Sequence, residues 1–341
     1  MIWLTWRQHR KQALYTLIAL AALAAVMIPT GVSMHDTFTR SGLAACIAKV
    51  GTAPAVSDGN TCSNLSQQFA NQYSSMTFVG ILFVILPVFV GIFFGAPLIA
   101  REIEHGTHRL VWTQGISRRR WVLVKFGLVG TATLALAVAY ALGMTWWFTP
   151  LVENGGGRMG DVSFDVQGVV PIGYTLFAVA AGMFAGALFK KVLPAMGVTL
   201  AAYVVVRVVI EAVARPRYMS PLTDSIPIDS SQQVNQTSGD WIYSQGVING
   251  DGKLVMANGS VSCGSGPPPG TLASGAPSGR GPANCGQALI QQGLGPGPFS
   301  NWIRYQPADR FWAFQGIETG IFLVLAALLV YLAVRRVRRI S

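Results

Sequence analysis

Two uncharged apolar runs, residues 76–100 and 126–149, enclose a strongly charged segment and place the first constraint on the fold. The hydrocarbon core of a bilayer is roughly 30 Å thick, and a helix needs about 20 apolar residues to cross it. Each run is long enough for that. Because lipid offers no hydrogen-bond partner to the backbone, a run of this kind must form a helix. We therefore predict two membrane-spanning helices joined by the charged segment.

Similar apolar runs recur along the chain and predict six spans in all, at residues 13–33, 76–100, 126–149, 169–189, 192–213 and 313–334. Composition agrees with this interpretation, because 51% of the residues are hydrophobic, only 11% are charged and the mean hydropathy is +0.45. The expected fold is an all-α integral membrane protein with six transmembrane helices. A soluble enzyme is excluded.

Basic residues predict the orientation of these spans. They cluster in the short segments at residues 1–12, 101–120, 190–191 and 335–339. Short segments rich in Lys and Arg remain in the cytoplasm. We therefore expect a multi-pass membrane protein with both termini cytoplasmic. The net charge of +11 then reflects this bias and attraction to anionic membrane lipid, and we expect no nucleic-acid partner.

The spans divide the chain into four regions. Residues 1–12 read MIWLTWRQHRKQ and predict a helix lying in the membrane interface, the alternative being a plain basic flank that only orients the first span. Residues 13–213 hold helices one to five, with an outer loop at 34–75, a cytoplasmic loop at 101–120 and a short Gly-rich connection at 150–168. Residues 214–310 form an extracytoplasmic loop or small domain, and residues 311–341 form the sixth helix and a basic cytoplasmic tail.

The region 214–310 has two parts with different patterns. Residues 240–261 alternate enough to predict a β-hairpin with its turn at Asn249 to Gly252. From Gly264 to Phe299 the density of Gly and Pro predicts an irregular loop without regular helix or sheet.

All four cysteines fall in predicted outer segments, Cys46 and Cys62 in the first loop and Cys263 and Cys285 in the large region. An oxidising exterior permits disulfides, and a bond within each loop would contribute about 3 kcal/mol in the chain-entropy model. We therefore expect two disulfides that tie down the outer segments, the alternative being cross-links between the loops. The spacing does not match a zinc site, and no metal is expected.

Several residues within the spans are informative. Arg207 and Glu211 lie four apart on one face of the fifth span, where they form either a structural pair that reaches the outer boundary or part of a substrate path or gate. The pattern GxxxG at Gly91 and at Gly182 predicts close helix contacts, the second at a dimer interface. Pro87 and Pro97 predict kinks in the second span.

The N-terminal segment MIWLTWRQHRKQ, the six spans and the loop REIEHGTHRLVWTQGISRRRWVLVK together resemble a permease of the ABC-2-type export family, in particular its actinobacterial members. The resemblance implies that residues 1–12 form an interfacial elbow helix and that the loop is the coupling helix that docks onto an ATPase subunit. The loop residues that match the family pattern are Glu102, Glu104, Gly106, Thr107, Ser117, Arg118 and Lys125. One departure is Gly115-Ile116, which replaces the usual proline before Ser-Arg.

The resemblance further implies a permease subunit of an ATP-driven exporter in the bacterial plasma membrane, working as a homodimer or with a related second permease. The chain has no GxxxxGK[ST] motif, since Gly252-Lys253 is followed by Leu254, so ATP would be bound by the partner subunit and the chain itself needs no cofactor. An alternative function is a membrane-bound accessory or sensor protein whose outer domain binds a ligand without transport. An intramembrane enzyme lacks a recognisable nucleophile and base.

Overall fold

The computed structural model describes residues 2–50, 59–106, 118–228, 239–263, 280–281 and 285–338, and most of them are helical. Its helices are α1 (Ile2–Arg40), α2 (Leu43–Val50), α3 (Gly59–Val84), α4 (Leu86–Val90), the π-helical η1 (Gly91–Gly95), α5 (Pro97–Glu104), α7 (Arg118–Leu151), the π-helical η2 (Val152–Gly156), α8 (Asp161–Val166), α9 (Val170–Phe189), α10 (Val192–Val209), the π-helical η3 (Ile210–Ala214), the 3₁₀-helical η4 (Arg215–Arg217), α11 (Cys285–Gln291), the 3₁₀-helical η5 (Ala308–Arg310) and α12 (Phe311–Arg338).

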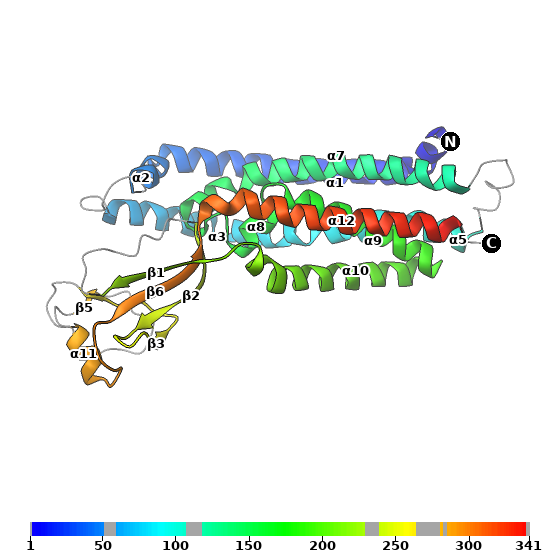
Figure 1. Ribbon diagram of the computed structural model, residues 1–341. Coiled ribbons are helices and arrows are strands. Elements are labelled where there is room, and N and C mark those ends of the chain that lie inside the picture. The colour runs from blue at the N-terminus through cyan, green and yellow to red at the C-terminus, as the bar shows by residue number, and fades with distance from the viewer. Residues whose placement is uncertain are drawn as a thin grey trace. The chain divides into compact units, whose positions relative to one another are not determined.

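Six helical segments in the described part of the chain are long and apolar enough to cross a membrane. They are Ile18–Arg40, Phe78–Glu104, Trp121–Gly155, Val170–Phe189, Val192–Arg217 and Ala308–Arg338. Each overlaps one of the six predicted spans, which confirms the prediction of a six-helix membrane protein. The start of α1, the end of α5, the start of α7 and the end of α12 lie at one end of the bundle, which we call the loop end (Figure 1).

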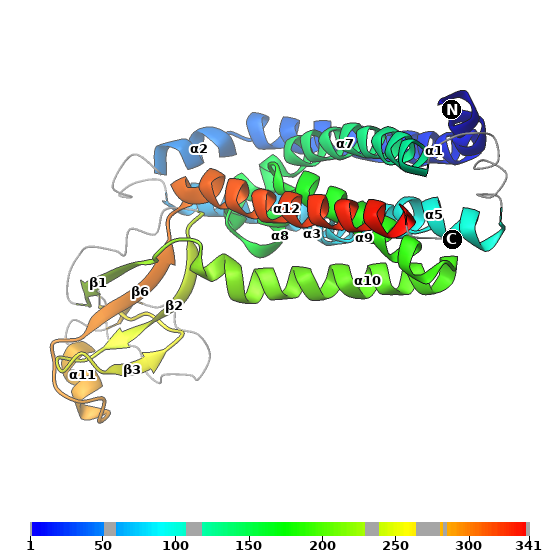
Figure 2. The same cartoon turned by 45° about the vertical axis from the view of Figure 1, so that its right-hand side comes forward.

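Helix α1 runs without a break from Ile2 to Arg40, so the first span and the predicted interfacial segment 1–12 share one helix. The first turns of α1 nevertheless lie at an angle to the rest of the helix (Figures 1 and 2). Their position in the membrane interface stays a prediction.

Helix α9 forms the centre of the bundle and packs against α4, η1, α5, α7, α10 and α12 (Figures 1 and 2). Its sequence is rich in Ala and Gly, and three quarters of its residues, 15 of 20, are buried. Small side chains let helix backbones approach closely, which is the main source of helix association in lipid. The central position of α9 follows from this composition.

The closest approach is between α9 and the second span. A Cβ atom added to Gly182 would lie 2.5 Å from the carbonyl oxygen of Gly91, and one added to Gly186 would lie 2.6 Å from that of Ala96. The predicted close helix contacts are thus confirmed, and the two GxxxG patterns contact each other within one chain. The prediction that Gly182 lies at a dimer interface is wrong, because this face is already buried inside the bundle.

The hydrogen-bond pattern of the second span changes near its prolines, while Ile85 and Ala96 keep right-handed helical φ and ψ. The kinks themselves stay a prediction. Helix α3 ends at Val84, Pro87 lies in the first turn of α4, and Pro97 begins α5 after the π-helical η1. Proline lacks the N–H that an unbroken helix would use and clashes with the preceding turn. The span therefore continues as one helical stretch with local changes in hydrogen bonding, and its last part, α5, ends at the loop end.

Residues Met219–Arg310 form a second compact unit. Its strands are β1 (Leu222–Pro227), β2 (Trp241–Ile248), β3 (Leu254–Ala257), β4 (Ser262–Cys263), β5 (Arg280–Gly281) and β6 (Ser300–Gln306). Four of them form an antiparallel sheet in the order β1-β6-β2-β3, and β4 pairs with β5. Strands β2 and β3 are the predicted hairpin, whose turn is held by the Asn249 side chain accepting hydrogen bonds from the N–H groups of Asp251 and Lys253.

Helix α11, Cys285–Gln291, lies within the stretch predicted to have no regular structure. The prediction was wrong for this segment because it used the Gly and Pro content of the whole stretch from Gly264 to Phe299. The segment CGQALIQQ contains no proline and one glycine, and Leu289 packs in the core of this unit with Ile228, Val247 and Phe299.

Cys46 and Cys62 form a disulfide that links α2 to the start of α3, with Cα atoms 5.8 Å apart. The side chains of Cys263 and Cys285 lie outside the described residues. Since two of the four cysteines are joined to each other, we predict that Cys263 pairs with Cys285. Peptide mapping without reduction should recover both pairs from membranes. A peptide joining Cys46 or Cys62 to either of the other cysteines would contradict this pairing.

Candidate functional site

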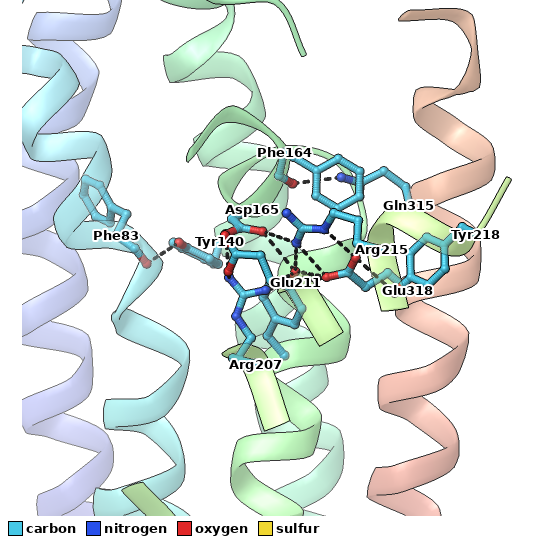
Figure 3. A network of polar contacts seen from close by, with 11 residues as sticks. Phe83, Tyr140, Phe164, Asp165, Arg207, Glu211, Arg215, Tyr218, Gln315 and Glu318 are labelled. Atoms are coloured by element: carbon cyan, nitrogen blue, oxygen red, sulfur yellow. Dashed lines mark hydrogen bonds and ion pairs between the residues drawn. The ribbon is translucent and has the colours of Figure 1, made fainter. Parts of the chain in front are cut away.

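Among the described residues, four charged side chains meet inside the bundle, at the end opposite to the loop end. Figure 3 shows Asp165 of α8, Arg207 of α10, Arg215 of η4 and Glu318 of α12 converging on one another. The hydroxyl of Tyr174, from α9, lies between them. All five residues are buried. We call this set the charge cluster.

Asp165 is positioned by α8, a helix of six residues in the stretch 150–168, which the sequence pattern predicted to be only a Gly-rich connection. The prediction missed α8 because the segment is too short to show a helical period. Tertiary contacts hold it. The side chain of Gln315 in α12 donates to the carbonyl of Phe164 and accepts from the N–H groups of Val169 and Val170. Gln315 therefore joins the end of α8 to the start of α9.

The Asp165 carboxylate bridges the two arginines. Its Oδ2 accepts from Arg207 Nη2 at 2.5 Å, and its Oδ1 accepts from Arg215 Nη2 at 2.7 Å. Each guanidinium also stacks on a ring, Arg207 at 4.0 Å from the centroid of Tyr174 and Arg215 at 4.3 Å from that of Phe164. Planar guanidinium groups prefer both arrangements.

Glu318 provides the second negative charge. Its two oxygens accept from Arg215 Nε at 2.9 Å and Nη2 at 2.8 Å, which is the paired geometry typical of Arg and carboxylate. The Tyr174 hydroxyl donates to the same carboxylate. Tyr218 donates to it at 3.3 Å, and partial burial followed by the charge of Glu318 raises the pKa of the Tyr218 phenol above its usual range.

The two arginines and the two carboxylates are balanced in formal charge. Removing a charge from water costs several kcal/mol, and only a well-bonded partner offsets it. Replacing buried ion pairs with apolar residues of similar size often leaves a protein at least as stable. We therefore interpret this buried charge cluster as a candidate functional site.

Arg207 and Glu211, predicted as a pair, are only loosely associated. Arg207 Nη2 lies 3.9 Å from Glu211 Oε2, while the same nitrogen bonds Asp165 directly. The Arg207 side chain is 8% exposed and that of Glu211 is 40% exposed, so Arg207 is directed to buried partners while Glu211 lies at the edge of the bundle. Whether the pair reaches the outer boundary or lines a path stays a prediction. The buried residues that Arg207 contacts come from α8, α9 and α12, which spacing along α10 cannot indicate.

The structure places the predicted loop residues as follows. Glu102 forms an ion pair with Lys125 of α7, whose side chain is 5% exposed. Glu104 is exposed, and its Oε2 accepts from the N–H of Val192 at 2.9 Å, which caps the start of α10. Gly106 follows α5 with a φ of +70°, a conformation that favours glycine.

The rest of the predicted loop lies outside the described residues. Thr107 and Ser117 belong to the part that is not described, and Arg118 is described only as the first residue of α7. Their role in ATPase coupling stays a prediction. Within the described residues, no group of three or more His, Cys, Asp or Glu side chains is placed to hold a metal ion.

The family of the chain is decided by a match over residues 17–215, which covers more than half of the sequence and includes four of the six spans and nearly all of the fifth. The matching family is described as ABC-2 membrane transporter related. The chain belongs to this family. No curated protein and no solved structure gives a match. As a member of an ABC-2 membrane transporter family, the chain is a multi-pass membrane protein, which agrees with the resemblance seen in its sequence.

Proposed function

We propose that the chain is the membrane-spanning permease subunit of an ATP-driven exporter, which forms the translocation pathway as two copies or with a related permease. ATP is bound by a separate subunit that docks at the loop end. Family membership and six spans support a transport role. The absence of a GxxxxGK[ST] motif from the sequence supports a separate source of energy. Both termini then lie in the cytoplasm with the loop end.

The observation that carries the proposal is how the two carboxylates of α5 are held. Glu102 bonds Lys125 of α7, and Glu104 bonds the start of α10. Helix α5 also packs against α9. A partner that moves the segment between α5 and α7 therefore pulls on several spans at once. Rigid-body input of this kind can shift a transporter between two states.

A pair of substitutions at Glu104 tests the docking. Glu104→Lys reverses an exposed charge, and we expect it to weaken association with the ATPase subunit at least about tenfold, because a like-charge contact costs several kcal/mol. Glu104→Gln removes the charge but keeps an oxygen that can accept from Val192. It should weaken association to an intermediate degree. Co-purification and ATP hydrolysis by the reconstituted complex measure the effect.

Glu153→Lys is the matched control, because Glu153 is also exposed but lies in η2, away from the loop end. It should leave association unchanged. If only Glu104→Lys weakens association, and the permease alone also loses stability, Glu104 acts as a helix cap and not as a docking group. Reversal of Glu102 would be a poorer test, since it places a second cation beside buried Lys125. If no ATP-binding subunit associates with the wild-type chain, the accessory or sensor alternative is favoured.

A further inference from the structure

Two carboxylates of the chain, those of Asp165 and Glu318, each contact both arginines of the charge cluster. Asp165 gives one oxygen to Arg207 and the other to Arg215. A carboxylate or phosphate held between two guanidinium groups is a common form of anion recognition, because the planar donors match the oxygens of the anion.

The residues of the charge cluster lie on two kinds of element, helices that span the membrane and one that does not. Tyr174, Arg207 and Glu318 lie on membrane-spanning helices, and Arg215 lies at the end of the span that includes α10. Asp165 alone lies on α8, which does not span. Of the two carboxylates, that of Asp165 is therefore the one carried outside the spans, on a short helix whose flanks include Gly157 and Gly168 with φ of +63° and +70°. Such positions can absorb a change in backbone direction.

A second observation concerns the helix that carries both arginines. Between Arg207 and Arg215 the chain is π-helical over Ile210–Ala214. Single π-helical turns are rare and occur frequently at functional sites. Here the turn lies between two residues that bond the same carboxylate, and its half-exposed Glu211 lies next to Arg207. The arginine pair thus lies beside a partly accessible edge of the bundle.

We infer that Arg207 and Arg215 form a binding site for an anionic group, a carboxylate or phosphate, which Asp165 occupies in the state described here. The anion binds when Asp165 is withdrawn, so the site would recognise the charged part of an exported molecule or of a lipid. The link to export rests on the proposed function. Binding itself can be tested on the permease chain alone, without ATPase or transport, so a failure here leaves the docking proposal standing.

The test is chemical rescue in the full-length chain, reconstituted in nanodiscs of phosphatidylcholine. Asp165→Ala empties the bridging position and leaves two guanidinium groups with one buried carboxylate. Its melting temperature should fall. Formate should raise that temperature by about 3 °C or more relative to chloride at equal ionic strength, because a ligand that binds only the folded state stabilises it. The wild-type chain should not respond in this way.

Glu211→Ala is the matched control, since it removes a carboxylate beside the same arginine without emptying the bridge. It should not gain a formate response. Adding Arg207→Gln to Asp165→Ala should abolish the response. Asp165→Ser serves as a second variant if the alanine variant does not fold, and recovery of folded protein only in formate counts as rescue.

A further comparison, between anionic lipid in the discs and soluble anions, distinguishes the source of the anion. If discs containing phosphatidylglycerol stabilise Asp165→Ala without formate, the site takes a lipid headgroup. If only formate or inorganic phosphate stabilises it, the site takes a soluble anionic group. If neither the alanine nor the serine variant responds to any of these anions, or if Glu211→Ala responds equally, Arg207 and Arg215 are structural and the inference is overturned.

Discussion

Replacing Glu318 with leucine is expected to lower the free energy of unfolding by about 3–5 kcal/mol, the usual cost of breaking a buried ion pair by removing one partner. The Glu318 side chain is 0% exposed and accepts two hydrogen bonds from Arg215. Its loss leaves two arginines and one aspartate in the bundle. Unfolding in mixed detergent micelles, followed by tryptophan fluorescence, measures the change.

Two further variants make this prediction specific to charge balance. Glu211→Leu removes a carboxylate that is 40% exposed and 3.9 Å from Arg207, so it should cost no more than about 1 kcal/mol. Glu318→Leu combined with Arg215→Met restores neutrality and should recover a large part of the loss. The explanation fails if Glu318→Leu is as stable as Glu211→Leu, or if the double variant is less stable than the single one.

Gly182→Ala is expected to destabilise the bundle by about 1–3 kcal/mol, the range for overpacking a well-packed core. The added Cβ would lie 2.5 Å from the carbonyl oxygen of Gly91 and 2.6 Å from the backbone nitrogen of Ala96. Both are backbone atoms, so no side chain can move aside to make room. Helix α9 and the second span would have to separate.

Gly197→Ala in α10 is the matched control, because nothing lies within 4 Å of the Cβ that it adds. It should be neutral or stabilise the helix by up to about 1 kcal/mol, since alanine is the better helix former. Unfolding of the two variants under the same conditions separates overpacking from helix propensity. Equal stability of the two would show that the GxxxG contact can relax.

Much of the fold was predictable, because its strongest determinants are local. An apolar run of sufficient length must form a helix in lipid, so the six spans follow from hydropathy alone. Pro87 and Pro97 each remove a backbone N–H from the second span wherever it packs. The GxxxG patterns at Gly91 and Gly182 indicated close contacts for the same kind of reason, although the sequence could not show that they contact each other.

The site was less predictable. Arg207 stood out as a charge within an apolar run, but its partners did not. Asp165 lies in a short polar stretch, and Glu318 is separated from Arg207 by most of the second half of the chain. Spacing along a helix favoured Glu211, which is the nearest neighbour in sequence. Glu318, the single acidic residue in the predicted run 313–334, was the one signal that could have been followed.

The sequence by itself determined how many helices cross the membrane, where prolines disturb their hydrogen bonding and which family the chain resembles, because these depend on composition and spacing within a few turns of helix. Only the tertiary structure decided that Asp165, Tyr174, Arg207, Arg215 and Glu318 meet. The free energy of a buried charge depends on the partners that other helices bring to it, and those partners lie far away along the chain.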